Sequence, residues 1–267
     1  MKKRPLIIAH RGASGYEKGN TLQAFSLAVK QGADFIELDI RQTLDKVLVV
    51  SHRRGIKKNR KNYWLDKYVF SDLKRVVGKQ NILTLERVFK EFSHKISFFL
   101  DLKQIGMEKD IVSLIRKFGL GKKVFFDSNN GLILLNLKKL APSFKTVLYY
   151  EPHDQRDLGE YRLTKAILFF IAFVLSLPIR NFLPKYFLGK VLFFGADGVS
   201  FYYRFLNKKM VKLFKEEKIK IFVWGIQSEK KAKKALAFNV EGIITKKPDV
   251  IRKILEENVK IKMKNAK

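Results

Sequence analysis

Three acidic side chains follow two short apolar runs of this chain, Glu37 and Asp39 in FIELDI and Asp101 in FFLDLK. We expect these runs to be neighbouring parallel strands, whose carboxyl ends meet at one face of the fold. Three carboxylates in one place repel one another unless a cation joins them, and oxygen ligands of this kind favour Mg²⁺ or Ca²⁺. The pattern therefore predicts a divalent metal site formed by Glu37, Asp39 and Asp101.

Basic and imidazole side chains accompany the carboxylates. Arg11 follows the first apolar run and Lys103 follows the third, and cations beside a metal are the groups with which proteins hold a phosphate. His10 and His52 complete the set, because hydrolysis of a phosphodiester needs one group that accepts a proton and one that donates it. The ordinary imidazole pKa, about 6.5, allows either role near neutrality. We expect no role for His94. His153 follows the fifth strand and either lines the barrel mouth or, as we favour, is a solvated loop residue.

Eight apolar runs alternate with amphipathic stretches, which predicts a single (β/α)8 TIM barrel of α/β class over residues 1–257, followed by a basic tail at 258–267. The expected strands are 6–10, 35–40, 97–103, 123–128, 145–150, 198–202, 220–226 and 241–246. The expected helices include 21–30, 85–92, 109–118, 132–140, 208–217 and 229–238. Barrel enzymes keep their catalytic groups at the carboxyl ends of the strands, where the candidate residues stand.

The run from Val47 to His52 follows the second strand too closely for a crossover helix, so it must fold back antiparallel. With Asp45 and Lys46 as a two-residue turn, paired positions sum to 91 and Asp39 lies opposite His52. This hairpin opens an insertion at 41–83, which we expect at the barrel mouth. Six of the nine residues in its RRGIKKNRK run, 53–61, are basic; the run either overhangs the mouth or is a solvated loop.

A second irregular segment, 160–192, separates the fifth and sixth strands and contains fourteen uncharged residues at 166–179. A helix of that length covers about 21 Å, less than the roughly 30 Å of a bilayer's hydrocarbon core, so a single span is disfavoured. Its apolar side chains leave no polar face. Two interpretations stay open: the segment docks in a membrane interface, or it packs within the protein or an oligomer. The sequence leaves the oligomeric state undetermined.

The charge balance, 55 basic against 25 acidic residues, leaves a net charge of +30 among 267 residues. The excess indicates either an anionic partner, such as a membrane surface, or a compositional drift toward lysine. Sequence-specific nucleic-acid recognition is not expected, because it relies on arginine and only 14 of the basic residues are arginine. The absence of cysteine excludes disulfides, thiolate metal sites and a cysteine nucleophile. The short apolar run near the start is no signal-peptide core, which predicts a cytoplasmic protein, peripheral on the inner membrane face if it docks.

Taken in order, these motifs resemble those of the glycerophosphodiester phosphodiesterases. The similar elements are HRGASGYEKGNTLQAF, ELD, VLVVSH, LTLERVF with FFLDLK, FVWGI and GIITKKPD, which span about residues 5–250. The resemblance implies metal-dependent hydrolysis of glycerophosphodiesters to sn-glycerol 3-phosphate and an alcohol, as part of lipid metabolism. It assigns acid–base catalysis to His10 and His52, the metal to Glu37, Asp39 and Asp101, and the phosphate to Arg11 and Lys103. Trp224 would line the substrate pocket, although a barrel-filling tryptophan fits equally.

Four positions depart from the family's usual pattern. Gly19 and Asp101 stand where the family usually has Glu, and Arg53 and Lys246 stand where it usually has Asp. The lost acidic groups raise the local positive potential, which favours a more anionic substrate or a slower reaction. Two alternatives stay open. One is a lysophospholipase D acting on membrane lysophospholipids, whose acyl chain the apolar segment 166–179 would guide; the other, which the departures favour, is a catalytically weak barrel that binds anionic lipid.

Overall fold

The computed structural model describes residues 4–78, 82–150 and 183–264, and within them eight parallel strands close into a barrel. The strands neighbour one another in chain order, and β1 pairs with both β2 and β11. Their bounds are β1 (Leu6–His10), β2 (Phe35–Gln42), β6 (Ser97–Leu102), β7 (Val124–Ser128), β8 (Lys145–Tyr149), β9 (Gly198–Tyr202), β10 (Lys220–Trp224) and β11 (Gly242–Thr245). The predicted TIM barrel is confirmed. His153 and the apolar segment 166–179 lie outside the described residues.

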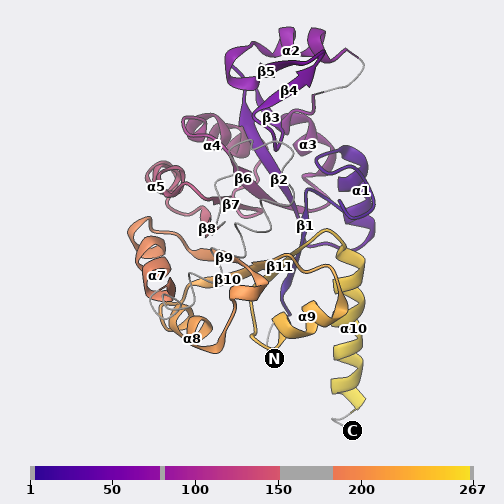
Figure 1. The fold of residues 1–267 in the computed structure, drawn as a ribbon, viewed down its shortest axis with the longest axis vertical. Helices are drawn as coiled ribbons and strands as arrows, with labels where there is room; N and C mark the ends of the chain where they lie inside the picture. The colour runs from indigo at the N-terminus through magenta and orange to yellow at the C-terminus, as the bar shows by residue number, and fades with distance from the viewer. Residues whose placement is uncertain (1–3, 79–81, 151–182, 265–267) are drawn as a thin grey trace.

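Helices form a ring around the strands (Figure 1), each one preceding the next barrel strand or, for the last, ending the described chain. They are α1 (Leu22–Lys30), α3 (Leu85–Phe92), α4 (Glu108–Lys117), α5 (Gly131–Leu140), α7 (Leu183–Phe193), α8 (Lys208–Glu216), α9 (Glu229–Leu236) and α10 (Pro248–Lys264). Side chains cap several of these helices. The side chains of Thr21, Thr84 and Asn207 each accept a hydrogen bond from the backbone N–H of the residue three positions later. Such caps satisfy backbone donors that a helix start leaves unpaired.

The barrel interior is apolar toward the amino ends of the strands. Alternate residues of each strand point inward, and an aromatic cluster of Phe99, Phe125 and Phe222 fills the centre with ring centroids 5.3–5.8 Å apart. Glycine makes room for it, because a Cβ on Gly242 would lie 2.7 Å from the Phe222 ring. The two-residue period that places these rings inside also turns the polar residues farther along each strand into the mouth of the barrel.

The hairpin after β2 forms, but its predicted register is wrong by one residue. Strand β3 (Leu48–Val50) pairs antiparallel with β2 in a register whose positions sum to 90, as in Ile40 with Val50. The loop has three residues rather than two: Lys46 adopts a positive φ of 67° and its N–H donates to the Thr43 carbonyl, 3.1 Å away. That geometry is a common three-residue hairpin loop. Asp39 therefore lies opposite Ser51, whose N–H donates to its carbonyl at 2.9 Å.

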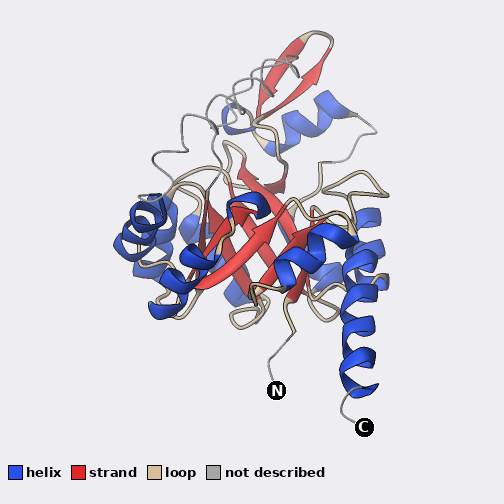
Figure 2. Cartoon of the chain, turned by 60° about the horizontal axis from the view of Figure 1, so that its bottom comes forward, coloured by secondary structure: helices blue, strands red, loops and turns tan. Residues whose placement is uncertain are grey.

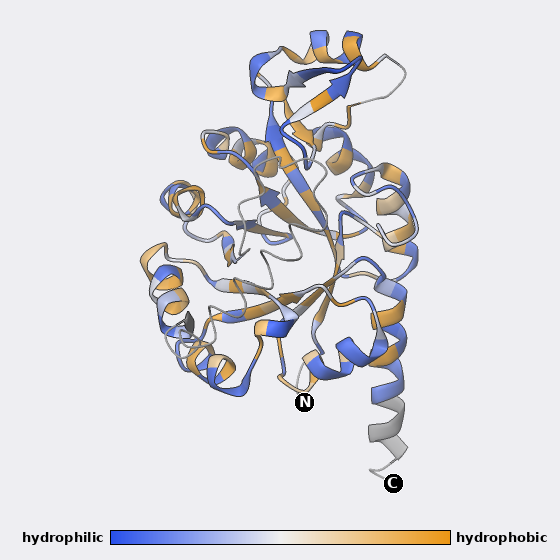
Figure 3. Ribbon diagram, in the orientation of Figure 1, coloured by the Kyte–Doolittle hydropathy of each residue, from blue (hydrophilic) through white to orange (hydrophobic). Residues whose placement is uncertain are grey.

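Beyond this hairpin, the described residues of segment 41–83 form a small subdomain outside the helix ring (Figure 1). It contains a second hairpin, β4 (Gly55–Lys58) and β5 (Lys61–Trp64), then a 3-10 turn η1 (Leu65–Lys67) and α2 (Phe70–Val77). A separate apolar cluster centred on Val49, Leu65 and Leu73 supports it. The basic run 53–61 is thus largely a β-hairpin and not an irregular loop; Figure 2 shows it at the opposite end of the molecule from the two termini, and Figure 3 shows it as mostly hydrophilic.

Helices α10 and α7 cover parts of the chain for which the sequence predicted no helix. Helix α10 continues to Lys264 and so includes most of the segment expected to be a basic tail. Helix α7 buries Phe187 and Val191 against the barrel but leaves Phe193 75% exposed. None of the helices in the described ranges is both long and apolar enough to span a membrane.

Candidate active site

Three aspartates lie side by side at the mouth of the barrel. Asp39 of β2 pairs in register with Asp101 of β6, which pairs with Asp127 of β7. Adjacent strands lie about 4.8 Å apart, so the row brings the carboxylates together. Glu37 stands two residues before Asp39 and faces the same way. All four are almost completely buried, with exposed fractions of 0–6%. Oxygen atoms of Glu37, Asp39 and Asp101 lie within 4.8 Å of one another, so the structure brings the predicted metal ligands together.

A sharp turn after β1 places His10 and Arg11 beside this row. Arg11 has a positive φ of 55°, and its backbone N–H donates to a Glu37 carboxylate oxygen at 2.7 Å. Gly12 follows with φ 78°, where a Cβ would lie 2.6 Å from the backbone of Ala24. Only glycine fits so close an approach in that conformation. The strained turn keeps His10 Nε2 4.0 Å from the Glu37 carboxylate.

The second histidine reaches the site through the β2–β3 hairpin. His52 Nδ1 lies 3.8 Å from Asp39 Oδ1, so the predicted convergence of Asp39 and His52 occurs despite the shifted register. The reason is that the strand pairing ends at Ser51 and the chain bends at 52–54. Arg41 fixes this bend, because its guanidinium donates two hydrogen bonds, of 3.1 and 3.3 Å, to the His52 carbonyl.

Two cations neutralise part of the carboxylate charge. Arg11 Nε lies 2.9 Å from Asp39 Oδ2, and the Asn20 side-chain amide donates to the same oxygen at 2.8 Å. Lys103 Nζ pairs with Asp101 and lies 3.2 Å from Asp39 Oδ1. It also donates a hydrogen bond of 3.1 Å to the Tyr149 hydroxyl. The two predicted phosphate-binding cations thus adjoin the predicted metal ligands.

Burial and mutual repulsion perturb the carboxyl groups. Burial, with repulsion from Asp39 and Asp101, raises the pKa of Glu37 well above its ordinary value. Burial raises the pKa of Asp101 to about 6, in spite of the opposing attraction of Lys103. Burial would also raise the pKa of Asp39, but the Lys103 and Arg11 charges overcome it, and the pKa is lowered. Burial and the Asp101 charge raise the pKa of Asp127 well above its ordinary value.

Both histidines are neutral in this environment. Burial and the Arg11 charge lower the pKa of His10 to about 3. Burial lowers the pKa of His52 to about 4, against the attraction of Asp39. Each side chain nevertheless keeps some access to the cavity, with 28% of His10 and 31% of His52 exposed. A neutral imidazole that a substrate can reach is able to accept a proton.

The carboxylate cluster fits a divalent cation. Asp101 Oδ1 is buried and accepts no hydrogen bond from the described residues, and Asp39 Oδ1, also buried, has the Lys103 ammonium group 3.2 Å away but no hydrogen bond. Such oxygen atoms are costly unless a ligand compensates them. Three converging carboxylates supply the hard oxygen donors that Mg²⁺ and Ca²⁺ prefer. Glu37, Asp39 and Asp101 therefore meet the requirements of a metal site in composition, burial and spacing.

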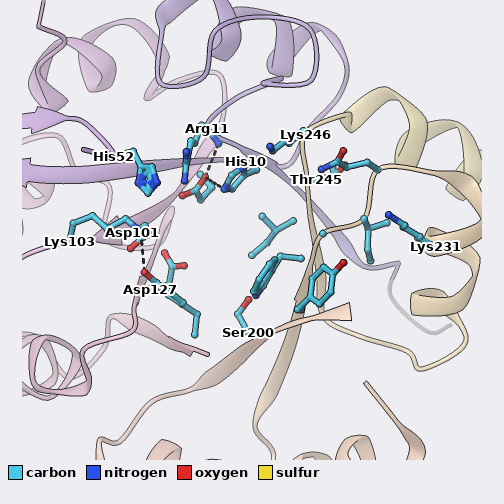
Figure 4. A pocket seen from close by; sticks show the side chains of 18 residues that line it. His10, Arg11, His52, Asp101, Lys103, Asp127, Ser200, Lys231, Thr245 and Lys246 are labelled. Carbon is cyan, nitrogen blue, oxygen red and sulfur yellow. Dashed lines mark hydrogen bonds and ion pairs between the residues drawn. The ribbon is translucent and has the colours of Figure 1, made fainter. Parts of the chain in front are cut away.

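A cavity of about 490 Å³ opens above the carboxylates. It is lined by His10, Arg11, Glu37, His52, Asp101, Lys103, Asp127, Tyr149, Ser200, Tyr202, Trp224, Gly225, Ile226, Gln227, Lys231, Ile244, Thr245 and Lys246, and Figure 4 shows these side chains. Trp224 is partly exposed in the cavity and packs against Tyr202, with ring centroids 4.9 Å apart. The tryptophan lines the cavity and also packs against the apolar cluster of the barrel interior, so it meets both expectations.

Several of these lining residues were missing from the sequence prediction. Asp127 ends the fourth strand, VFFDS, as Asp101 ends the third, and the same rule of strand-end carboxylates would have identified it. Tyr149 and Tyr202 end the next two strands but carry no distinctive spacing. Lys231 belongs to α9, and nothing in its lysine-rich sequence distinguishes it from its neighbours.

The departures from the expected pattern fall in different places. Gly19 packs against Arg11, since a Cβ there would lie 3.0 Å from the Arg11 Cβ. Arg53 is exposed and does not line the cavity, nor does any other residue of the basic run 53–61. Lys246 does line the cavity. Of the two basic replacements, Arg53 and Lys246, only Lys246 therefore changes the cavity wall.

His94, for which the sequence predicted no role, is exposed in a turn after α3.

Comparison with known proteins gives a consistent result. Residues 10–250 match the glycerophosphoryl diester phosphodiesterase family. YhdW of Bacillus subtilis (strain 168), assigned as a glycerophosphodiester phosphodiesterase, is 30% identical over 92% of this chain and 96% of its own. The glycerophosphodiester phosphodiesterase of Bacillus altitudinis is 28% identical over 94% of this chain and 98% of its own.

Solved structures share the fold. A phosphodiesterase from Oleispira antarctica, in complex with the product sn-glycerol-3-phosphate, superposes with a TM-score of 0.72 at 20% identity and covers 94% of this chain and 97% of its own. The glycerophosphodiester phosphodiesterase of Thermotoga maritima gives a TM-score of 0.71 at 22% identity, with 95% and 100% covered. At these identities the similarity concerns the barrel itself.

Proposed function

The chain belongs to the glycerophosphoryl diester phosphodiesterase family and is a glycerophosphodiester phosphodiesterase, and from this premise we propose a metal-dependent hydrolysis that releases sn-glycerol 3-phosphate and an alcohol. The observation that carries the proposal is the convergence of Glu37, Asp39 and Asp101 beside two reachable histidines. The related phosphodiesterase bound to sn-glycerol-3-phosphate supports the choice of product.

In the proposed reaction, Glu37, Asp39 and Asp101 would hold Mg²⁺ or Ca²⁺, which would supply positive charge to stabilise the phosphoryl oxygens. Arg11 and Lys103 bind the same phosphate and keep it in place. One histidine of the pair His10 and His52 accepts the proton of the attacking water, and the other donates a proton to the alcohol oxygen as its bond to phosphorus breaks. One water is consumed, and one phosphate monoester and one alcohol are formed.

The charge balance explains how neutral histidines can fill both roles. The pKa of His10 and that of His52 are lowered by burial in a cavity that also holds Arg11 and Lys103. A bound phosphodiester anion offsets those cations and raises the imidazole pKa, since a nearby negative charge favours the protonated form. Substrate binding would thus prepare one histidine as the proton donor.

The proposal is tested by measuring sn-glycerol 3-phosphate release from glycerophosphocholine and glycerophosphoethanolamine. We expect release with Mg²⁺ or Ca²⁺, its loss in EDTA, and its return when the cation is restored. Release that continues unchanged in EDTA after exhaustive dialysis would contradict a metal-dependent mechanism. Absence of release with either cation, from these diesters and from lysophospholipids, would contradict the proposed activity and favour a binding role.

Nothing in the comparisons favours the two alternatives, a lysophospholipase D and a weak lipid-binding barrel. Association with a membrane surface is compatible with the hydrolase, and we propose it as a peripheral property of a cytoplasmic enzyme. Helix α7 supports it, because Tyr186, Leu192 and Phe193 are at least half exposed beside Lys190. Apolar side chains flanked by lysine are typical of interfacial docking on anionic lipid.

Sedimentation with vesicles of phosphatidylglycerol and phosphatidylcholine tests this docking. We expect a Leu192→Ser, Phe193→Ser double variant to bind severalfold less than the wild type, because two exposed apolar side chains no longer enter the interface. A Leu44→Ser variant in the β2–β3 loop, remote in sequence from this helix, is the matched control, because it also removes a half-exposed apolar side chain. Unchanged sedimentation of the double variant would refute docking through α7.

A further inference from the structure

The cavity has two chemically different sides. Asp101, Lys103, His52 and Asp127 lie together on one side, and Lys231 lies on the other, as Figure 4 shows. Lys246 lies between them, close enough to His10 that its charge contributes to lowering the pKa of that histidine. The predicted metal and phosphate groups therefore occupy only part of the space, and the remainder carries its own positive charge.

Lys231 and Lys246 lack the carboxylate partners that the cations near the carboxylate cluster have. Arg11 and Lys103 each pair with aspartate carboxylates, whereas no carboxylate of the described residues lies within 4.0 Å of the ammonium group of Lys231 or Lys246. Lys231 is only partly exposed, and its Nζ lies 5.3 Å from the centroid of the Tyr203 ring. Contact with this ring, which lies outside the cavity lining, restricts the side chain of Lys231, which lines the cavity, whereas Lys246 lines it as an exposed side chain.

The charges of the groups that line the cavity indicate the charge of a ligand that would fill its second side. The three metal ligands are opposed by Arg11, Lys103 and a divalent ion, which leaves one positive charge for the single negative charge of a phosphodiester. Asp127 neighbours Asp101 on the first side of the cavity, away from Lys231 (Figure 4). Lys231 and Lys246 add two positive charges elsewhere in the cavity wall, with no carboxylate of the described residues within 4.0 Å of either ammonium group. A phosphate monoester, which carries up to two negative charges, matches them.

We propose that Lys231 and Lys246 form a second anion subsite, which selects glycerophosphodiesters that carry a further phosphate group on the same molecule. This inference rests on the proposed function, because it takes the first phosphate to lie at the carboxylate cluster. The preferred substrates are diesters with two phosphorus centres, in contrast to glycerophosphocholine, whose ammonium group the two lysines repel. Ser200 Oγ and the Gln227 side chain, which also line the cavity, provide polar contacts for the linking alcohol.

A binding measurement tests the subsite without depending on turnover. Calorimetry at 0.15 M salt with excess Mg²⁺ compares alkanediol bisphosphates of three to six carbons with the corresponding monophosphates. We expect at least one bisphosphate to bind wild-type protein about tenfold more tightly than its monophosphate, since a charge-assisted contact adds to the first. Equal affinities across the whole series would overturn the inference.

Two lysine variants make the test specific to position. In Lys231→Gln, the affinity for the bisphosphate should fall about tenfold while the affinity for the monophosphate changes less than twofold. Lys230→Gln is the matched control, because this neighbouring lysine is exposed and does not line the cavity, and it should change neither affinity more than twofold. An equal loss for both ligands in Lys231→Gln, or an equal effect of Lys230→Gln, would refute a subsite at Lys231.

Activity assays keep this inference separate from the proposed function. Wild-type enzyme should hydrolyse glycerophosphoglycerol bearing a terminal phosphate with a higher kcat/KM than glycerophosphoglycerol itself, and Lys231→Gln should abolish the difference. If both diesters are cleaved equally well by the wild type, the second subsite is refuted while the hydrolase stands. If neither is cleaved but the Lys231-dependent preference for bisphosphates persists, the hydrolase is refuted while the anion subsite stands.

Discussion

Replacing His10 with alanine should lower kcat for sn-glycerol 3-phosphate release by about 10²- to 10⁴-fold, the contribution typical of a positioned acid or base. His10 is held by the Arg11–Gly12 turn with Nε2 4.0 Å from Glu37, and its side chain faces the cavity. No other described histidine besides His52 lines that cavity, so water would have to replace the lost group. The measurement is steady-state hydrolysis of glycerophosphocholine with saturating Mg²⁺.

The controls separate chemistry from folding. His52→Ala should produce a loss of similar size, because each proton transfer is needed in every turnover. His94→Ala should retain full activity, since His94 is exposed in a turn after α3. Circular dichroism should show the same thermal transition for all three variants within a few degrees. A His10→Ala enzyme that keeps a tenth or more of the wild-type kcat would remove His10 from the proposed acid–base pair.

Substitution of Asp101 by asparagine should weaken divalent-ion binding more than about 100-fold, since loss of an outer-shell partner alone typically costs 10- to 100-fold. Asp101 contributes one of the three converging carboxylates, and its Oδ1 accepts no hydrogen bond from the described residues. Asparagine keeps the shape but removes the charge that attracts the cation. Titration calorimetry with Mg²⁺ and Ca²⁺ measures the effect directly, and activity at a fixed ion concentration should fall in parallel.

Acid should weaken the wild-type metal site in the same way. Burial raises the pKa of Asp101 to about 6 and raises that of Glu37 as well, so protons compete with the ion for these oxygen atoms as the pH falls through that range. The affinity for the divalent ion should therefore be highest at pH values well above 6 and should decline as the pH falls below 6. Affinity that stays constant from pH 7.5 to pH 5 would contradict a carboxylate site with these raised pKa values.

Asp127→Asn is the matched control for the metal prediction. Asp127 neighbours Asp101 in the strand register and is equally buried, but it lies outside the group of three. Burial and the Asp101 charge raise the pKa of Asp127 well above its ordinary value, so the neutral amide resembles the form that its surroundings favour. We expect this variant to retain metal affinity within about threefold. Retained metal affinity in Asp101→Asn, or an equally large loss in Asp127→Asn, would move the metal site away from the predicted three ligands.

The sequence by itself determined the barrel and most of the polar side chains at the carboxyl ends of its strands. Parallel strands separated by helices present their carboxyl ends to one side, and the two-residue period of a strand decides which side chains point inward. Both rules are local, so they predicted that Glu37, Asp39 and Asp101 would converge and that His10 would join them. Asp127 follows the same rule and was recoverable from the sequence.

Only the tertiary structure decided how the remaining parts meet. The register of the β2–β3 hairpin depends on a three-residue loop with Lys46 at positive φ, and the bend that brings His52 to Asp39 depends on a hydrogen bond from Arg41. The position of Lys231 in the cavity wall depends on how α9 packs against the barrel. The physical reason is that strand faces follow from backbone periodicity, whereas loop geometry and helix placement follow from contacts between residues far apart in the chain.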